Sequence, residues 1–229
     1  MENENKMLIP GSIILAGLVI AGAVVYIGLP RIPLVPPPAP SGVPTAPPAV
    51  AEVLKIKEGD FVLGNPSSKV VIIEYGDFQC PFCGKFAKEV EPQIKEQFVK
   101  TGKAAFVYRD FAFLGEESFR SSEAARCAGE QGKFWEYHGK LFSSQKGENQ
   151  GAFADANLKK WARDLGLDGT KFDLCFTSGK HREAVQLSSD GGRTAGVNGT
   201  PATFVNGKLV SGAVPFATFK QLIEEELKK

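Results

Sequence analysis

The sequence has no excess of charge of either sign and few histidines or methionines, which argues against binding of nucleic acid or copper. Its 229 residues carry 27 Lys and Arg against 26 Asp and Glu, a formal net charge of +1. No excess of basic residues therefore indicates binding to nucleic acid. Only two histidines and two methionines occur. Both methionines, Met1 and Met7, precede the predicted folded region, so no thioether in that region could assist copper binding.

The first 50 residues differ in kind from the remainder. Residues 7–29 contain no charged side chain and are long enough to cross a bilayer as one helix. A cleaved signal sequence is the alternative interpretation. However, the apolar stretch is longer than a usual signal core, and no small-x-small cleavage pattern follows it. We therefore expect residues 1–30 to form an uncleaved N-terminal membrane anchor.

Proline dominates the next segment, residues 31–50. Such a segment is expected to form an extended, polyproline-like chain, because proline fixes one backbone torsion and lacks an amide proton. It would separate a folded domain at residues 51–229 from the bilayer and let it reach other proteins. The whole chain is 43% hydrophobic and 10% aromatic, which suffices for one sizeable core.

A Cys-Pro-Phe-Cys motif at residues 80–83 follows a predicted buried strand at residues 70–75. Cys80 is then expected at the N-terminus of a helix, where free backbone N–H groups and the helix dipole stabilise a thiolate. Pro81 suits the first helical position, and Cys83 falls on the same helical face as Cys80. We predict that Cys80 is the nucleophile of thiol-disulfide exchange and Cys83 the resolving thiol.

Glu74 lies six residues before Cys80, within the predicted strand. An unpaired carboxylate is costly in such an apolar setting, and burial would raise its pKa towards neutrality. Glu74 is therefore a candidate proton acceptor for Cys83. The alternative is a glutamate at the edge of the strand that faces water.

A helix is predicted from Pro81 to about Lys100, and Pro92 should kink it. Apolar residues at four-residue spacing would give this helix one apolar face: Phe82, Phe86, Val90, Ile94 and Phe98. The apolar residues 104–108 predict a second strand. Parallel pairing of this strand with residues 70–75, through a right-handed crossover, makes a βαβ unit.

The C-terminal part predicts a hairpin followed by a helix. Residues 202–205 and 208–211 flank Asn206-Gly207, a strong signal for a two-residue hairpin turn. The final helix would turn apolar side chains inward: Phe216, Phe219, Leu222, Ile223 and Leu227. Residues 111–197, between the two units, are too many for a loop, so we predict an inserted helical lobe.

Two further cysteines, Cys127 and Cys175, lie in the predicted insertion and have no CxxC partner. We expect them to form one structural disulfide, which agrees with a domain outside the cytoplasm. Two buried free thiols are the alternative. The histidines, His138 and His181, are expected to be surface or cap residues, and we assign them no role.

Three motifs occur in an order that resembles DsbA-type thiol:disulfide oxidoreductases. They are residues 74–83 (EYGDFQCPFC), 127–135 (CAGEQGKFW) and 199–204 (GTPATF). The resemblance extends from about Phe61 to the C-terminus. It implies an α/β, thioredoxin-like fold with an inserted helical lobe, and it places the nucleophile at Cys80, the resolving thiol at Cys83 and a buried acid at Glu74.

The resemblance also implies a cis-proline at Pro201, beside the CxxC motif. The backbone of Thr200 would then pair with an extended substrate segment, and Phe82 would belong to the apolar surface that substrates contact. The sequence departs from the best-known oxidases of the family at two positions. Phe82 stands where they have histidine, and Thr200 stands where they have valine. Both departures bear on the direction of the reaction.

We expect a monomeric protein disulfide oxidoreductase, without cofactor or metal, that introduces disulfide bonds into unfolded or extended exported proteins and so assists their folding. The resemblance implies a membrane partner that reoxidises Cys80 and Cys83, of the DsbB or vitamin K epoxide reductase (VKOR) kind. A reductase or isomerase of the same fold is one alternative. A tethered carrier of copper or zinc, or a holdase, is the alternative from another class.

Overall fold

The computed structural model describes residues 48–229. The predicted membrane anchor, residues 1–30, lies outside the described residues, as does most of the predicted linker. The last part of that linker already begins a helix, α2 (Pro48–Val53). Within the described part of the chain, no helix is both long enough and apolar enough to cross a bilayer.

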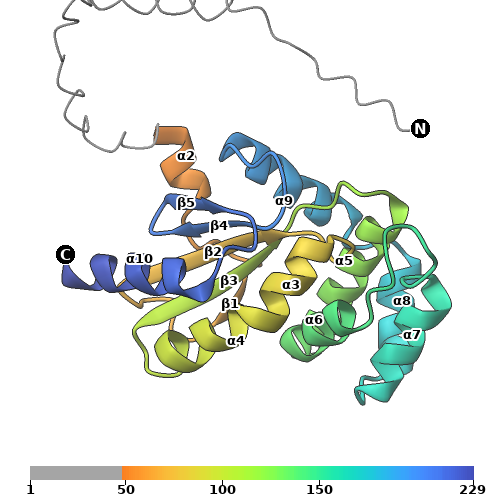
Figure 1. The fold of residues 1–229 in the computed structure, drawn as a ribbon. Helices are drawn as coiled ribbons and strands as arrows, with labels where there is room; N and C mark the ends of the chain where they lie inside the picture. Colours follow the sequence, from red (N-terminus) through yellow and green to blue (C-terminus); the bar gives the residue numbers. More distant parts are fainter. Residues whose placement is uncertain (1–47) are drawn as a thin grey trace, which may run out of the picture. The chain divides into compact units, whose positions relative to one another are not determined.

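The core of the fold is a mixed five-stranded sheet (Figure 1). Its strands are β1 (Phe61–Leu63), β2 (Val70–Gly76), β3 (Ala104–Asp110), β4 (Ala202–Val205) and β5 (Lys208–Ser211). They lie in the order β1-β3-β2-β4-β5. Strands β2 and β3 pair in parallel, as predicted, and all other pairs are antiparallel.

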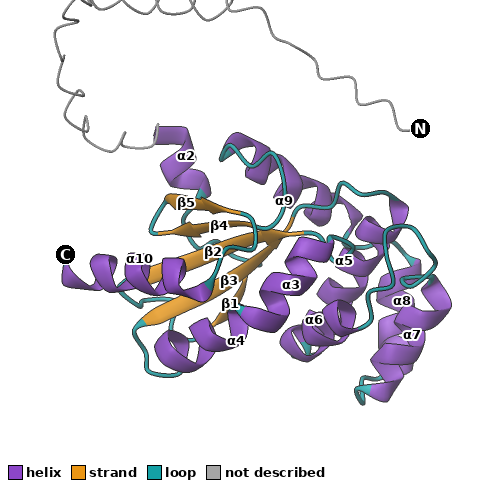
Figure 2. Ribbon diagram, in the orientation of Figure 1, coloured by secondary structure: helices purple, strands orange, loops and turns teal. Residues whose placement is uncertain are grey.

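Helices cover both faces of the sheet (Figure 2). One face packs against α3 (Pro81–Glu89), α4 (Glu91–Ile94) and α10 (Phe216–Lys228). The other face packs against α2 and the C-terminal part of α9 (Arg182–Thr194) with the residues that follow it. Side chains alternate between these layers along β2, since Val70 and Ile72 face α3 and α10, whereas Ile73 and Tyr75 face α9.

The predicted helix of residues 81–100 is interrupted. It ends as α3 at Glu89, continues as α4, and widens into a π-helical turn, η1 (Lys95–Val99). Pro92 has no N–H to donate to the preceding turn, which accounts for the break beside it. Four of the five residues on the predicted apolar face are buried: Phe86, Val90, Ile94 and Phe98.

Phe82 is the exception, because 64% of its surface is exposed. Phe82 belongs to the predicted apolar face by its spacing, but other side chains do not cover it. Helix α10 covers the later turns, where Phe219 packs on Phe86 and Phe216 on Phe98, with ring centroids 5.4 and 6.4 Å apart. The first turn of α3 lies beyond that cover.

The C-terminal hairpin turns at Asn206 and Gly207, whose φ angles are 45° and 83°, as the predicted turn requires. In α10, Phe219 and Ile223 are fully buried, and the other predicted inner residues pack on the same cluster while partly exposed.

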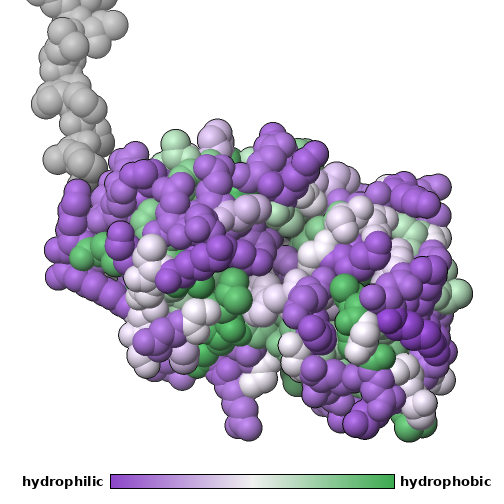
Figure 3. All heavy atoms as spheres, turned by 90° about the horizontal axis from the view of Figure 1, so that it is seen from below, coloured by the Kyte–Doolittle hydropathy of each residue, from purple (hydrophilic) through white to green (hydrophobic). Residues whose placement is uncertain are grey.

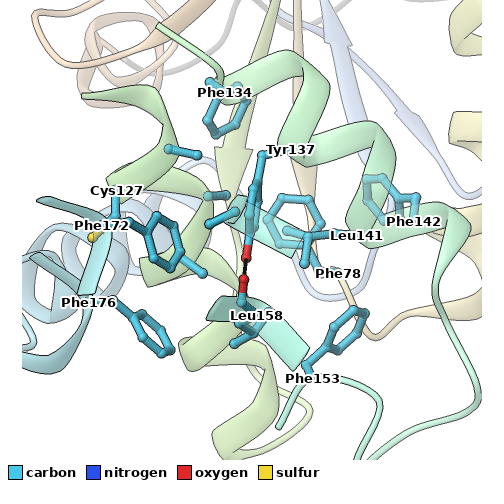
Figure 4. Close-up of a cluster of buried hydrophobic side chains, with 14 of the residues drawn as sticks. Phe78, Cys127, Phe134, Tyr137, Leu141, Phe142, Phe153, Leu158, Phe172 and Phe176 are labelled. Atoms are coloured by element: carbon cyan, nitrogen blue, oxygen red, sulfur yellow. Dashed lines mark hydrogen bonds between the residues drawn. The ribbon is translucent and has the colours of Figure 1, made fainter. Parts of the chain in front are cut away.

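The insertion is a helical lobe of α5 (Glu116–Gly129), α6 (Phe134–Ser143), α7 (Asp155–Asp164) and α8 (Gly169–Thr177), followed by α9. Its core is rich in aromatic side chains (Figure 4). Tyr137 lies at the centre of that core, where its hydroxyl donates a hydrogen bond to the carbonyl oxygen of Leu158 at 2.8 Å. A disulfide between Cys127 and Cys175 joins α5 to α8.

His138 is buried, with 1% of its surface exposed, so its predicted place at the surface was wrong. The reason is its spacing, because His138 lies four residues after Phe134 and four before Phe142 on the inner stripe of α6. Its ring contacts those of Tyr108 and Phe142, each with a centroid separation of 4.8 Å. His181 lies at the N-terminus of α9, 2.8 Å from a carboxylate oxygen of Glu130.

Candidate active site

Cys80 and Cys83 are both free thiols at the N-terminus of α3. Cys80 is the residue directly before the helix, and Pro81 occupies the first helical position. Cys80 keeps 6% of its surface exposed, whereas Cys83 is completely buried. An attacking partner can therefore reach Cys80 but not Cys83.

The two thiols have opposite acidities. A hydrogen bond from the Cys83 thiol, with further ones from the backbone N–H groups of Cys83 and Phe82, lowers the pKa of Cys80 to about 6. Burial raises the pKa of Cys83 well above its ordinary value, and the nearby Cys80 and Glu74 raise it further. Near neutral pH, Cys80 is accordingly a thiolate and Cys83 a thiol.

Glu74 is fully buried in β2, where it pairs in register with Tyr108 of β3 and Thr203 of β4. It is not a glutamate at the solvent edge of a strand. Neither carboxyl oxygen has a hydrogen-bond partner among residues 48–229. Burial raises the pKa of Glu74 well above its ordinary value, and the charge of Glu91 adds to the rise. Glu74 can therefore hold a proton at neutral pH.

The peptide bond between Thr200 and Pro201 is cis and leads directly into β4. The Cys80 thiol lies 3.4 Å from the carbonyl oxygen of Thr200. The loop before β4 and the first turn of α3 thus meet at Cys80, although 120 residues separate them in sequence. Phe82 projects from the same turn as Cys80 and is exposed to solvent.

Two residues that fix this site were not predicted from the sequence. The side-chain amide of Gln145, in the loop after α6, donates to the carbonyl oxygens of Phe78 and Cys80 at 2.7 and 3.0 Å. The carboxylate of Asp77 accepts hydrogen bonds from Ser118 and from the backbone N–H groups of Phe113 and Gln79. These hydrogen bonds hold the segment between β2 and Cys80 against the helical lobe and the residues that lead into it.

The local sequence indicates a role for Asp77 but not for Gln145. Asp77 follows a strand and comes shortly before a helix, a position where aspartate commonly accepts backbone hydrogen bonds, so its role could have been found. Gln145 stands in a polar loop 65 residues from Cys80, and nothing in its local sequence distinguishes it.

A family model described as thioredoxin matches residues 57–225. A probable disulfide bond formation protein D from Bacillus anthracis is 29% identical over 171 residues, which cover 73% of this chain and 78% of the relative. The chain is also 32% identical over 156 residues, 67% of its length, to a Na(+)/H(+) antiporter NhaA 1 from Salinispora arenicola, but the match covers only 22% of that longer protein.

Solved structures resemble the fold as well. Oxidised BdbD from Bacillus subtilis superposes with a TM-score of 0.71 at 26% identity, covering 75% of this chain and 95% of BdbD. The α-DsbA1 protein of Wolbachia pipientis also reaches a TM-score of 0.71, at 22% identity, covering 78% of this chain and 96% of the other. At 22% identity, the similarity to α-DsbA1 is evidence for a shared fold alone.

Proposed function

Because the chain belongs to the thioredoxin family and is a DsbA-type thiol:disulfide oxidoreductase, we propose that it introduces disulfide bonds into exported proteins. The observation that carries this direction is the lowered pKa of Cys80. A thiolate exists only in the reduced protein, so whatever stabilises it favours the reduced form and makes the disulfide a better oxidant.

The chemistry takes two exchange steps. A substrate thiolate attacks Sγ of Cys80 in the oxidised protein, the bond between Cys80 and Cys83 breaks, and its electron pair leaves on Cys83. A second substrate thiolate then attacks the substrate sulfur of the mixed disulfide, and Cys80 leaves as a thiolate. Two electrons pass to the protein, and the substrate gains one disulfide. We assign Glu74 the role of supplying the proton that Cys83 takes up.

Substrates would bind around Thr200, Pro201 and Phe82. Phe82 offers an exposed apolar side chain beside the nucleophile, which suits an extended, unfolded segment. The backbone of Thr200 lies beside Cys80, where we expect it to pair with that segment as an added strand.

For the whole chain we propose a tethered enzyme: a membrane anchor at residues 1–30, a proline-rich linker at residues 31–50, and the catalytic domain outside the cytoplasm. Since each turnover leaves Cys80 and Cys83 reduced, oxidation of many substrates requires a membrane reoxidant of the DsbB or VKOR kind. The disulfide between Cys127 and Cys175 is compatible with an oxidising compartment.

The direct test is oxidative refolding. The full-length protein in detergent, in its oxidised form, is mixed with a reduced, unfolded secretory protein whose activity depends on its disulfides. We expect activity to return faster than with glutathione disulfide alone, and the Cys80→Ser variant to give no acceleration. A wild-type protein that instead reduces the native disulfides of that substrate in the same glutathione buffer would establish the reductase alternative.

A further inference from the structure

Unpaired polar atoms gather beneath the CxxC motif, on the sheet face that α3 and α4 cover. They are both carboxyl oxygens of Glu74, the hydroxyl of Tyr108, Nε2 of His138 and Oε2 of Glu91. Each is buried, and none has a hydrogen-bond partner within the described chain. Such atoms are uncommon in folded proteins, because desolvation without a partner is costly. Their concentration around one site therefore calls for a functional explanation.

These side chains are neighbours pair by pair and so define a path, although no hydrogen bond joins Glu74, Tyr108, His138 and Glu91 to one another among residues 48–229. Glu74 and Tyr108 are register neighbours on the parallel strands β2 and β3. The ring of Tyr108 lies 4.8 Å from that of His138, measured between centroids. Nδ1 of His138 lies 3.9 Å from Oε1 of Glu91, and that oxygen forms an ion pair with Lys95.

The far end of the path opens to solvent. Glu91, Lys95 and His138 line a groove of about 820 Å³ between α3, α4 and α6. The side chain of Lys95 keeps 25% of its surface exposed, whereas that of Glu91 keeps 3%. Helices α4 and α6 lie towards the side of the molecule viewed in Figure 3, whose surface is hydrophilic with separate apolar patches. The groove thus gives Glu91 and His138 a contact with solvent, and it extends along α3 to Pro81 and Gln145 beside Cys80.

The ionisation of these groups suits proton transfer. Burial raises the pKa of Glu91, although Lys95 opposes the rise. Burial and the charge of Lys95 lower the pKa of His138, which keeps its ring neutral. The ionisable groups that act on Glu74 come from four elements: Cys80 and Cys83 with α3, Tyr108 in β3, Glu91 in α4 and Lys95 in η1. His138, in α6, faces Tyr108 and Glu91.

We propose that Glu91, together with His138 and Lys95, passes protons between Glu74 and the groove, so that Cys83 exchanges its proton with solvent through the interior of the domain. When Cys83 leaves as a thiolate, it takes the proton of the Glu74 carboxylic acid, and the resulting carboxylate is reprotonated from the groove through Glu91. Reoxidation reverses each transfer. The inference rests on the proposed function, and Glu91 is a positioning residue that acts through Glu74.

A purely structural role for Glu91 would be the ion pair with Lys95, one helical turn along. Exposed pairs at this spacing contribute little to stability, and burying such a pair carries a desolvation cost that can exceed the attraction. An ion pair alone also leaves unexplained why Oε2 of Glu91, Nε2 of His138 and both oxygens of Glu74 stay unpartnered.

The first test compares Glu91→Gln with Glu89→Gln in the full-length protein. Glu89 also lines the groove but is exposed, so its substitution removes the same charge without changing the buried path. Rapid mixing of each oxidised protein with a dithiol peptide gives the exchange rate from about pH 5 to 9. We expect Glu91→Gln to slow exchange at neutral pH by about 5- to 20-fold, a part of what general acid–base catalysis commonly contributes. The pH profile should also move to lower pH, because loss of the Glu91 charge lowers the pKa of Glu74.

Glu89→Gln should keep the wild-type rate and profile. The melting temperature of each variant separates a transfer defect from a folding defect. A Glu91→Gln variant with the rate and pH profile of the wild type would overturn the proposal.

A second pair of variants tests the groove without touching a buried residue. Gly139 is exposed on α6, lines the groove, and has no atom near the position that a Cβ would take. Gly139→Leu would cover the groove with an apolar side chain, and both it and Gly139→Ala favour the helix. We expect only Gly139→Leu to slow exchange and to reduce its dependence on pH, and equal rates for the two variants would overturn the solvent route.

These outcomes are separate from those of the proposed function. Exchange in either direction moves the proton of Cys83, so a reductase would show the same effects of Glu91→Gln and Gly139→Leu. A wild-type protein that oxidises substrates while these variants behave like it would remove only the internal proton route.

Discussion

Cys80 and Cys83 lie three residues apart on one helix, yet their acidities move in opposite directions. The difference follows from their places in the first turn of α3. Cys80 precedes the helix and accepts hydrogen bonds from N–H groups and from Cys83, whereas Cys83 lies in the first turn, without solvent and near Glu74. The same local geometry therefore makes one thiol a nucleophile and keeps the other protonated until its partner has reacted.

This asymmetry predicts how the reduced protein responds to pH. The folded pKa of Cys80, about 6, lies below its ordinary value of 9.0. Its thiolate therefore stabilises the reduced fold fully above pH 9, and this contribution is lost as pH falls through 6. We expect the free energy of unfolding of the reduced protein to rise by about 3 kcal/mol from Cys80 alone between about pH 5.5 and 8.5.

Urea denaturation of reduced wild type and reduced Cys80→Ser at several pH values checks this slope. The difference between the two proteins measures the titration of Cys80 together with its effect on the pKa values of Cys83 and Glu74. The thiolate absorbance near 240 nm should titrate at the same pH in the wild type. Parallel stability curves for the two proteins would contradict the assigned pKa.

The exposure of the two sulfurs predicts which variant captures substrates. Cys83→Ser keeps the accessible nucleophile but has no resolving thiol, so mixed disulfides through Cys80 should accumulate. Cys80→Ser leaves only a buried thiol of raised pKa, and we expect no capture. The substrates are unfolded proteins that carry disulfides, so the Cys80 thiolate attacks a substrate disulfide and one substrate sulfur leaves as a thiolate. Non-reducing electrophoresis after this incubation distinguishes the two variants, with the double variant as control. Capture by Cys80→Ser alone would reverse the roles of the two cysteines.

Among the elements, the helical lobe depends on a covalent link of its own. The disulfide between Cys127 and Cys175 closes a loop of 48 residues between α5 and α8 and lies in the same hydrophobic cluster as Cys80 and Cys83. We expect Cys127→Ala/Cys175→Ala to lower the free energy of unfolding by about 3–4 kcal/mol, since the cross-link restricts the unfolded chain.

Exchange at Cys80 should survive this change at temperatures where the variant remains folded, because neither cysteine of the lobe contacts the CxxC pair through a hydrogen bond within the described residues. Denaturant titration of the protein with and without the Cys127/Cys175 pair, each in a Cys80→Ser/Cys83→Ser background, measures the stability difference. A difference below about 1 kcal/mol would show that the lobe is held by its aromatic core alone.

Elements with strong local patterns could be predicted from the sequence. The apolar run of β2, the CxxC helix with its break near Pro92, and the hairpin at Asn206-Gly207 each depend on neighbouring residues only. Strand β1 was missed because it has only three residues and depends on a distant contact. Arg109 of β3 binds the carboxylate of Asp60, the residue directly before β1.

The site divides in the same way. The proximity of the cysteines and Glu74 could be predicted because they belong to one strand and the following turn. The parts that come from distant segments were missed or misplaced. His138 was expected at the surface because its local sequence is polar on one side, and its burial became evident only when α6 was packed against Phe78 and Tyr108. The roles of Gln145 and Glu91 likewise depend on tertiary contacts, which the local sequence does not indicate.

At the scale of the whole molecule, the sheet brings together three segments that are far apart in sequence. The carboxyl end of β2 leads to Cys80, the cis Thr200-Pro201 bond leads into β4, and the helical lobe, inserted between them, supplies His138 and Gln145. The lobe therefore contributes to the chemistry beneath the nucleophile as well as to the covering of the sheet. This arrangement lets Cys80 face substrates while Cys83 and Glu74 face the interior.

The direction of the reaction is decided by the reduction potential of the Cys80/Cys83 pair in the full-length protein. The lowered pKa of Cys80 stabilises the reduced form, but Phe82 cannot donate to the thiolate as a histidine in its place could. We therefore expect an oxidising value, between about −120 and −160 mV, rather than the roughly −270 mV of thioredoxin. Equilibration with glutathione buffers and thiol trapping measures this potential. In the double variant that lacks Cys127 and Cys175, only the Cys80/Cys83 pair contributes thiols to the measurement.

Phe82→His should shift the potential further towards −120 mV if stabilisation of the thiolate governs the equilibrium. A potential near −250 mV would place the chain among reductases, because the glutathione pool of an oxidising compartment would then hold its CxxC pair as an unreactive disulfide unless a reducing partner supplied electrons.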